Sequence, residues 1–483
     1  MSQELIDWRE KNLNRISRSF CAAKWYNASI HLGHGYSGSC HLPLPHPIDL
    51  EEIKTNPSAI HNTKHKKQMR KMMLTGVRPA ECSYCWKIED IGRNNVSDRV
   101  YKSIIYKEED IKKIHEMDWR DDVLLKTLEI SFDRTCNFAC SYCNAGYSTT
   151  WSKEIQKFGP YQKMKTDSAG AYRSDGSWAD QFGKYNERNP FVQAFFEWWP
   201  ELSKSLEEIR ITGGEPSLSH NFWDFIEVLK ENPSPELRLA VNSNLGMTDV
   251  VLEKMIAMTH DLEIKEMDIY TSNESFGRHA EYIRDGLVYE RWRSNLVNLI
   301  ERAKLRSLTI MMTINSLCLF SITEFLDDMI ELKKKYGANK PNVDLNILRW
   351  PAFMSPLALP DNLKYELHAK LNNWFVEKMT PDLFSIGEIA QFQRLMDYIQ
   401  VVEKGHNTTE DDKTLLHHDF KSFYTQYDVR RNKDFRETFP ELIDWYDSIE
   451  VDMNIPIASM TDGRITHFET GTYPFPKEEI KII

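Results

Sequence analysis

Hydrophobic and polar positions alternate between strand-like and helix-like patterns from about residue 126 to residue 350. Short apolar runs are typical of buried strands, and apolar residues at every third or fourth position mark one face of a helix. Phe222, Phe225, Ile226 and Leu229 form one such helical face. The predicted strands lie at 127–132, 207–216, 237–244, 266–275, 307–315 and 343–350.

Alternating strands and helices predict an α/β fold with a parallel sheet and right-handed crossovers. Six such units are too few to close an eight-stranded barrel, so we expect a partial (βα)6 barrel similar to an incomplete TIM barrel. Ligands of parallel sheets bind at the carboxyl ends of the strands. Polar motifs follow four of the predicted strands, and we expect them to meet at one rim.

The chain has 483 residues, too many for one compact core. We predict a cysteine-rich N-terminal domain at 1–125, the partial barrel at 126–350 and a mainly helical region at 351–483. The polar insertion at 161–188 is predicted to be a loop or flap over the site. The basic stretch at 61–73 is predicted to be a solvated helix face.

Charge and hydropathy exclude two classes of partner. Lys and Arg total 61 against 72 Asp and Glu, for a net charge of −11, so a broad nucleic-acid-binding surface is not expected. No apolar run approaches the roughly 20 residues that span a bilayer. The N-terminus is charged throughout and lacks the apolar core of a signal peptide. We therefore expect a cytoplasmic protein that has no contact with a membrane.

Seven of the eight cysteines lie in the first third of the chain, which suggests metal binding rather than a disulfide scaffold. Cys136, Cys140 and Cys143 fall within the eight residues CNFACSYC. Thiolates bind iron–sulfur clusters and zinc alike. A closed zinc site takes four ligands, whereas three leave a metal position open. On spacing alone, a zinc with a fourth ligand from elsewhere remains an alternative.

A second motif, GGEP at residues 213–216, ends the next predicted strand. Gly213 and Gly214 allow the backbone to approach a ligand closely. Glu215 can accept a charge-assisted hydrogen bond from an ammonium group. A GGEP sequence by itself is usually only a turn. After a C-x-x-x-C-x-x-C loop, it resembles the radical S-adenosylmethionine (SAM) superfamily.

This resemblance implies that Cys136, Cys140 and Cys143 hold three irons of a 4Fe–4S cluster, whose fourth iron binds the amine and carboxylate of SAM. It also implies reductive cleavage of SAM to a 5′-deoxyadenosyl radical, which abstracts hydrogen from a substrate. A reductant such as flavodoxin or ferredoxin would supply the electron. The residues that the resemblance implies for contact with SAM are Tyr142, Gly213, Gly214, Glu215, Pro216, Ser243, Asn244, Ser272, Glu274, Arg284 and Asn315.

These contacts differ in how closely they follow the family pattern. Tyr142 matches the aromatic residue before the last cysteine, and Arg284 resembles an arginine that pairs with the SAM carboxylate. Ser272 and Glu274 occupy the place of a Ser-x-Asp-like ribose motif, in which Glu replaces the usual acid. Asn315 ends the fifth strand and is expected to face adenine or substrate. Outside the resemblance, the residues more often found as helix caps or surface ion-pair partners are Ser243, Asn244, the segment Ser272 to Ser275, and Arg284.

Four further cysteines, Cys21, Cys40, Cys82 and Cys85, contain one C-x-x-C pair and can fully ligate a second cluster or a zinc. They resemble the SPASM or twitch domains of radical SAM proteins, which carry auxiliary iron–sulfur clusters. Here the cysteines precede the barrel, whereas the familiar domains follow it. We predict one auxiliary 4Fe–4S centre, with zinc, or metal bound by Cys82 and Cys85 alone, as the alternatives.

The resemblance implies a peptide or protein substrate, because relatives with auxiliary domains crosslink, epimerise or oxidise peptides. Other relatives oxidise small molecules such as aminosugars, which gives a second hypothesis. A third hypothesis, from another class, is a non-catalytic metal-binding module that holds RNA or protein through the basic stretch at 61–73. Iron content separates the enzyme from the binding module.

Overall fold

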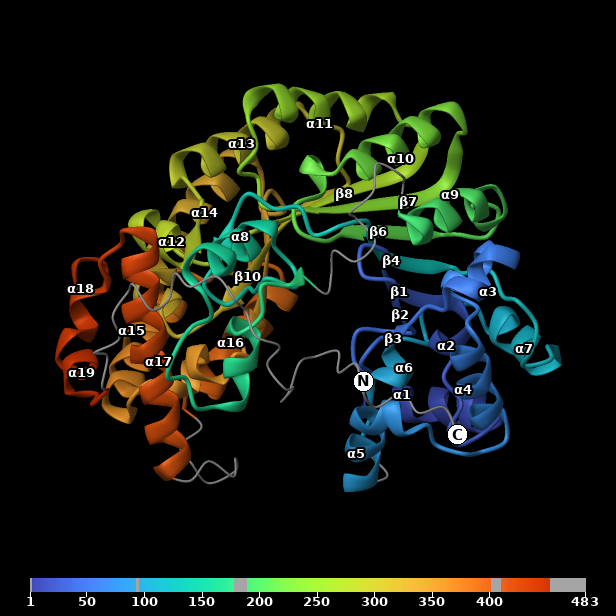
Figure 1. Ribbon diagram of the computed structural model, residues 1–483, viewed down its shortest axis with the longest axis horizontal. Helices are drawn as coiled ribbons and strands as arrows, with labels where there is room; N and C mark the ends of the chain where they lie inside the picture. The colour runs from blue at the N-terminus through green and yellow to red at the C-terminus, as the bar shows by residue number, and fades with distance from the viewer. Residues whose placement is uncertain (1, 93–94, 178–188, 401–409, 452–483) are drawn as a thin grey trace.

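The computed structural model describes residues 2–92, 95–177, 189–400 and 410–451. One nine-stranded sheet crosses the molecule in the order β11-β10-β8-β7-β6-β4-β1-β2-β3 (Figure 1). Neighbouring strands are parallel from β11 to β1, and β2 and β3 continue the sheet by antiparallel pairing. The strands are β1 (Asn27–His31), β2 (Tyr36–Gly38), β3 (His46–Pro47), β4 (Thr127–Ser131), β6 (Glu208–Thr212), β7 (Ser234–Ser243), β8 (Ile264–Ser272), β10 (Ser307–Ile314) and β11 (Asn342–Ile347).

The six predicted strands coincide with β4, β6, β7, β8, β10 and β11, which confirms the α/β fold with a parallel sheet. The sheet is open, with β11 at one edge and β3 at the other. In β10, buried positions alternate with half-buried ones, and the buried side chains are Leu308, Ile310, Met312 and Ile314. The strand therefore contributes one apolar face to the core.

Helices connect the parallel strands and cover the sheet (Figure 1). The predicted apolar face of Phe222, Phe225, Ile226 and Leu229 lies on α10 and is fully buried. The helices of this region are α8 (Thr149–Phe158), α9 (Pro190–Leu202), α10 (His220–Glu231), α11 (Asp249–Asp261), α12 (Gly277–Ile283), α13 (Tyr289–Arg302) and α14 (Ile322–Tyr336). Short 3-10 helices lie at Asp167–Tyr172, Pro216–Leu218, Cys318–Phe320, Ala352–Met354 and Pro356–Ala358.

The N-terminal region shares the main sheet and also has a hydrophobic core of its own. Residues 27–31 of β1 pair in register with residues 127–131 of β4, so the sheet continues across the predicted boundary at residue 125. The separate core contains Phe20, Trp25 and Trp86. The N-terminal helices are α1 (Ser2–Arg9), a π-helix (Glu10–Asn14), α2 (Ala23–Tyr26), α3 (Leu50–Thr55), α4 (Lys64–Leu74), α5 (Ser83–Ile91), α6 (Asp98–Tyr101) and α7 (Glu108–Glu116), with 3-10 turns at Pro57–Ile60 and Ala80–Cys82.

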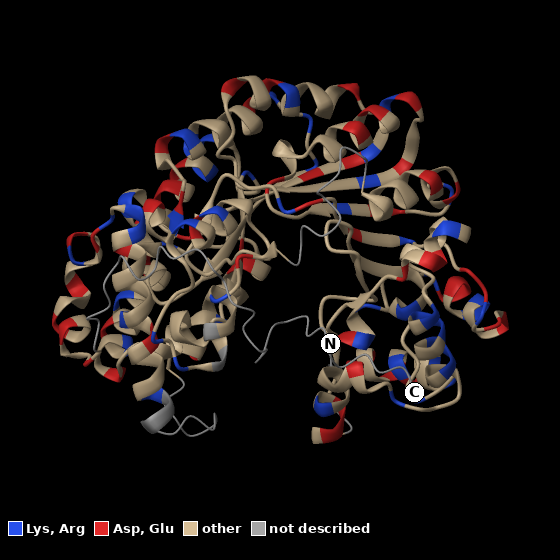
Figure 2. Cartoon of the chain, viewed as in Figure 1, with Lys and Arg blue, Asp and Glu red and all other residues tan. Residues whose placement is uncertain are grey.

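The basic stretch at 61–73 forms most of α4, and its charges are visible along that helix (Figure 2). Lys64 and Lys71 are exposed, as expected of a solvated face. Lys66 and Arg70, however, are fully buried, at 1% and 0% exposure. The prediction of a solvated face is therefore wrong for these two residues, because α4 turns them inward against α2.

The described C-terminal residues are mainly helical. Part of the polar insertion packs against them: the Asp419 carboxylate accepts hydrogen bonds from the backbone N–H groups of Lys165 and Thr166 at 2.6 and 2.7 Å. Tyr172, from the same insertion, contacts Phe423 with ring centroids 4.8 Å apart. The helices are α15 (Asp361–Lys378), α16 (Ile386–Ile399), α17 (Glu410–Arg431), α18 (Phe435–Thr438) and α19 (Ile443–Ser448), with a 3-10 turn at Pro440–Leu442.

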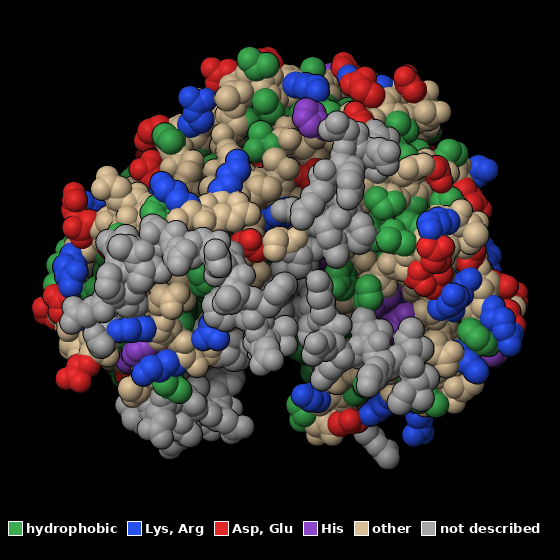
Figure 3. Space-filling view, in the orientation of Figure 1, with side chains coloured by type: hydrophobic (Ala, Val, Ile, Leu, Met, Phe, Trp, Pro, Cys, Tyr) green, Lys and Arg blue, Asp and Glu red, His purple; other side chains and the backbone are tan. Residues whose placement is uncertain are grey.

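Within the described ranges, no helix is both long enough and apolar enough to cross a membrane. Acidic and basic side chains are mixed over the face seen in Figure 3, and neither sign dominates it. Residues 178–188 of the predicted flap and the last 32 residues of the predicted helical region (452–483) lie outside the described residues.

Candidate functional site

The loop with Cys136, Cys140 and Cys143 lies between the carboxyl end of β4 and the start of α8. Hydrogen bonds from side chains hold its backbone at several points. Thr150 Oγ1 donates to the carbonyl of Cys136 at 2.7 Å, and Trp151 Nε1 donates to the carbonyl of Cys140 at 3.0 Å. A two-residue strand, β5 (Ala139–Cys140), also pairs with β9 (Arg284–Asp285). The three thiols are therefore presented by a fixed backbone at the carboxyl rim of the sheet.

The three thiols are partly buried and near enough to influence one another's charge. Burial is the main cause that raises the pKa of Cys136, to about 12, and the neighbouring Cys140 raises it further. Burial also raises the pKa of Cys140 and of Cys143. Thiols bind metals as thiolates. A positively charged metal centre would stabilise the ionised form of all three thiols.

Among the described residues, no group of three or more His, Cys, Asp or Glu side chains is arranged to hold a single metal ion. An iron–sulfur cluster makes a different demand, because each thiolate binds its own iron and the sulfurs need not converge on one point. Three soft donors in one short, partly buried loop fit one corner of such a cluster.

The GGEP motif packs directly against the segment that precedes Cys136. Gly213 has φ +131°, and a Cβ there would lie 2.7 Å from the carbonyl oxygen of Asp133. A Cβ on Gly214 would collide with the carbonyl oxygen of Thr135. The Glu215 backbone N–H donates to that same carbonyl at 2.6 Å. The two glycines therefore serve the close approach of two loops, and this approach places Glu215 beside the cysteine loop.

Glu215 is only 2% exposed and is held by hydrogen bonds on both carboxylate oxygens. Its Oε1 accepts from Ser217 Oγ at 2.7 Å and from Ser243 Oγ at 2.8 Å, and its Oε2 accepts from the Asn244 backbone N–H at 2.6 Å. Burial raises the pKa of Glu215, and these hydrogen bonds oppose that rise. Asn244 Nδ2 lies 3.9 Å from Cys136 Sγ, so the three motifs meet as predicted.

A second buried carboxylate, Glu274, lies on the other side of the cysteine loop. It forms an ion pair with Arg284 at 2.5 Å and accepts hydrogen bonds from Tyr142 Oη at 3.0 Å and Asn315 Nδ2 at 3.5 Å. Arg284 Nη1 lies 3.8 Å from Cys140 Sγ. The predicted residues are thus brought together, but Glu274 is engaged by protein donors rather than facing an open space.

The remaining predicted residues have simpler surroundings. Pro216 is buried and begins the 3-10 helix Pro216–Leu218. Ser272 is half-buried at the end of β8 and pairs with Met311 of β10. Cys318, interpreted from the sequence as a small buried residue, is fully buried and lies against Asn315.

The four N-terminal cysteines, although far apart in sequence, line one cavity in the separate N-terminal core. Cys21 and Cys85 are buried, and Cys40 and Cys82 are half-buried. Burial raises the pKa of Cys82 to about 12 and that of Cys85 to about 11. The structure therefore brings together the four thiols that were predicted to share one centre.

Sequence reasoning missed the charged residues around this cavity. Lys24, at 2% exposure, lines the cavity and forms an ion pair with Glu81. Arg99 and Lys102 line it as well. A signal was present, because Lys24 follows Cys21 by three positions and Glu81 directly precedes Cys82.

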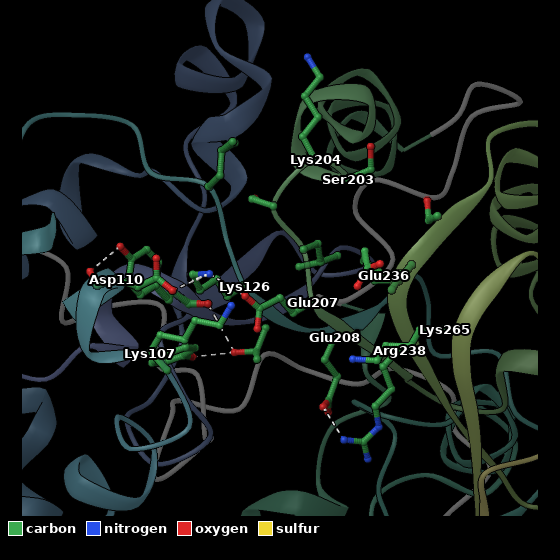
Figure 4. A pocket seen from close by; sticks show the side chains of 18 of the residues that line it. Lys107, Asp110, Lys126, Ser203, Lys204, Glu207, Glu208, Glu236, Arg238 and Lys265 are labelled. Atoms are coloured by element: carbon green, nitrogen blue, oxygen red, sulfur yellow. Dashed lines mark hydrogen bonds and ion pairs between the residues drawn. The ribbon is translucent and has the colours of Figure 1, made fainter. Parts of the chain in front are cut away.

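Another cavity, of about 1310 Å³, lies at the opposite ends of the parallel strands, where they begin (Figure 4). Its charged side chains largely pair with one another. Lys126 contacts Asp110 at 2.9 Å and Glu207 at 2.6 Å, and Arg238 contacts Glu208 at 3.0 Å. No cysteine lines it. The candidate site is therefore assigned to the carboxyl rim rather than to this larger space.

Comparison with known proteins gives a partial match. The chain is 29% identical over 117 residues to the GTP 3′,8-cyclase of Pectobacterium atrosepticum and 30% identical over 117 residues to that of Yersinia pestis. Each match covers 24% of this chain and 26% of the relative, so the chain matches about a quarter of the length of these curated proteins. No family model matches the chain.

Two solved structures are similar at low scores. The structure of Streptococcus suis SuiB bound to the precursor peptide SuiA has a TM-score of 0.32 and 11% identity, covering 77% of this chain and 74% of that one. The structure of anSMEcpe with bound AdoMet has a TM-score of 0.29 and 12% identity, covering 67% of this chain and 100% of that one. Scores this low support no inference about this chain.

The partial sequence match and the arrangement of the site resemble the same superfamily. The GTP 3′,8-cyclases are radical SAM proteins. In this chain the cysteine loop lies at the carboxyl rim of a parallel sheet, and GGEP packs against it from the next strand. The chain is similar to these radical SAM proteins over 117 residues, and its site has the residues expected from that resemblance.

Proposed function

We propose that the chain is an enzyme that binds a 4Fe–4S cluster through Cys136, Cys140 and Cys143, cleaves SAM reductively and abstracts hydrogen from a substrate. The observation that carries this proposal is the meeting of the three thiols with the buried carboxylate of Glu215 at one rim. When bound, the cluster supplies the electron for cleavage of the SAM carbon–sulfur bond.

The chain's own residues provide binding and orientation at this rim. Glu215 Oε2 accepts the Asn244 N–H, and a carboxylate oxygen has a second lone pair that can accept a hydrogen bond from the SAM ammonium. Arg284 points its guanidinium towards Cys140 and is held there by Glu274. Tyr142 is fixed by the same carboxylate. The buried Arg284–Glu274 and Tyr142–Glu274 contacts fix the side chains around the thiols and shield them from solvent.

The proposed substrate is a peptide or protein side chain. The resemblance to radical SAM proteins that carry auxiliary cysteine domains supports this proposal. Oxidation of a small molecule such as an aminosugar is the alternative for the same site. We also propose an auxiliary 4Fe–4S centre on Cys21, Cys40, Cys82 and Cys85, which are gathered around one cavity. Because four thiolates would ligate every iron, this centre would leave no iron open for SAM. A flavodoxin or ferredoxin in the cytoplasm is the proposed reductant.

The test is SAM cleavage by anaerobically reconstituted protein with dithionite, followed by chromatographic measurement of 5′-deoxyadenosine. Wild type should form it even without substrate, and Cys140→Ala should form none. Glu227→Gln is the control, because Glu227 is exposed on α10 and its replacement should leave cleavage intact. Equal cleavage by wild type and Cys140→Ala would overturn the assignment. Zinc without iron would instead favour the binding module.

A further inference from the structure

The N-terminal core buries more positive charge than its acidic side chains balance. Lys24, Lys66 and Arg70 are each at most 2% exposed. Lys24 has an acidic partner in Glu81. Among the described residues, the Lys66 ammonium forms one hydrogen bond, between its Nζ and the neutral ring nitrogen Nδ1 of His61 at 3.1 Å. Buried cations are rarely found without a compensating anion.

Arg70 adds to this excess, because its hydrogen bonds go to neutral groups. Its guanidinium donates to the carbonyl of Lys24 at 3.1 Å and to Asn62 Oδ1 at 3.1 Å, and contacts His61 Nε2 at 2.9 Å. Burial and the neighbouring cations Arg70 and Lys24 lower the pKa of Lys66 well below its ordinary value. Lys24, Lys66 and Arg70 therefore repel one another in this core.

The excess lies beside the four-cysteine cavity. Lys24 lines that cavity and interacts electrostatically with Cys82 and Cys40. Helix α4, which carries Lys66 and Arg70, packs on α2, which carries Lys24 (Figure 1). Four thiolates outweigh the positive charge of an iron–sulfur core, so a fully ligated centre in this cavity is an anion. It supplies the counter-charge that the cations lack.

We propose that Lys24, supported by Lys66 and Arg70, is a positioning residue that stabilises the auxiliary centre in its reduced form. The step is the gain of one electron from a strong reductant such as dithionite, with no bond formed or broken. Nearby fixed positive charge favours the more negative, reduced state, and in a low-dielectric core it is poorly screened. This proposal rests on the auxiliary centre of the proposed function.

The test uses two variants of opposite sign in full-length protein that carries Cys136→Ala, Cys140→Ala and Cys143→Ala, so that only the N-terminal centre holds iron. Midpoint potentials are measured by redox titration with dithionite, followed by electron paramagnetic resonance. Lys24→Met should lower the potential, and Glu81→Gln should raise it. We expect about a tenfold change in the reduction equilibrium for each, which is about 59 mV for one electron. Lys66→Met should shift the potential in the same direction as Lys24→Met.

Lys87→Met is the matched control, because Lys87 is exposed two positions after Cys85 and solvent screens its charge. It should leave the potential unchanged. If the Lys24–Glu81 ion pair only supports the fold, Lys24→Met and Glu81→Gln should both lose iron, or should both shift the potential in the same direction. Either result would overturn the proposal. Absence of iron from the triple-alanine protein would overturn it as well. SAM cleavage by wild type is scored separately, so failure of the SAM site and failure of this inference remain distinguishable.

Discussion

The two groups of cysteines in this chain are built in different ways. Cys136, Cys140 and Cys143 come from one eight-residue loop at the carboxyl rim of the main sheet. The other four come from three separate segments and line a cavity in a second hydrophobic core. One group is shaped by a local backbone turn, and the other exists only after the N-terminal region has folded.

The charges around the two groups differ as well. Glu215 and Glu274 lie next to the cysteine loop, one facing the Cys136 side and the other holding Arg284 near Cys140. Around the N-terminal cavity, cations predominate, with Lys24, Arg99 and Lys102 against Asp98. A site that binds a cationic ligand such as SAM needs a carboxylate, whereas a closed anionic centre needs cations. The difference therefore predicts separate roles for the two groups.

Loss of the loop cysteines gives the largest expected effect. Replacement of Cys136, Cys140 and Cys143 by alanine should abolish 5′-deoxyadenosine formation and remove about half of the roughly eight irons expected from two 4Fe–4S clusters. Iron analysis and the cleavage assay on the same preparation check this. If cleavage persists in the triple variant, SAM is activated elsewhere and the comparison between the two groups fails.

Loss of the N-terminal pair should have the complementary effect. Cys82→Ala with Cys85→Ala should remove the other half of the iron, while cleavage of SAM in the absence of substrate continues. The reason is that these thiols lie in a separate core from the loop. Metal analysis distinguishes the outcomes: zinc in place of the lost iron would make this centre structural, and unchanged iron content would show that the four cysteines do not share a centre.

The sequence predicted the six parallel strands and the meeting of the cysteine loop with GGEP, because both depend on local periodicity and on the rule that parallel strands end at one rim. It did not predict that Glu274 is saturated by Tyr142 and Arg284, or that Lys66 is buried. Those features depend on which faces of distant elements pack together. The amphipathic turn of α4, for example, was hidden by its many basic residues.

Removal of the Glu215 charge should have an intermediate effect. Glu215→Gln keeps the shape but loses the attraction to the SAM ammonium, worth about 1.5–3 kcal/mol for a charged hydrogen bond. SAM affinity should fall roughly tenfold to a hundredfold, with iron content unchanged. Equilibrium binding to reconstituted protein measures this. Glu227→Gln, at an exposed position on α10, is the control and should bind SAM normally. Unchanged affinity in Glu215→Gln would mean that GGEP only packs the loops together.

The smallest expected effect belongs to Tyr142, because its hydroxyl acts on the protein rather than on SAM. Tyr142→Phe removes the 3.0 Å hydrogen bond to Glu274 and leaves the Arg284–Glu274 ion pair in place. A hydrogen bond to a charged group is worth about 1.5–3 kcal/mol, and an unfolding entropy of about 1 kcal/mol/K for a chain of this length converts this to a fall in melting temperature of about 1.5–3 °C. Iron content and SAM affinity should stay near wild type. Tyr365→Phe removes an exposed hydroxyl and should not change the melting temperature. A large loss of SAM affinity in Tyr142→Phe, without loss of stability, would instead show that the hydroxyl contacts SAM, as the family resemblance implies.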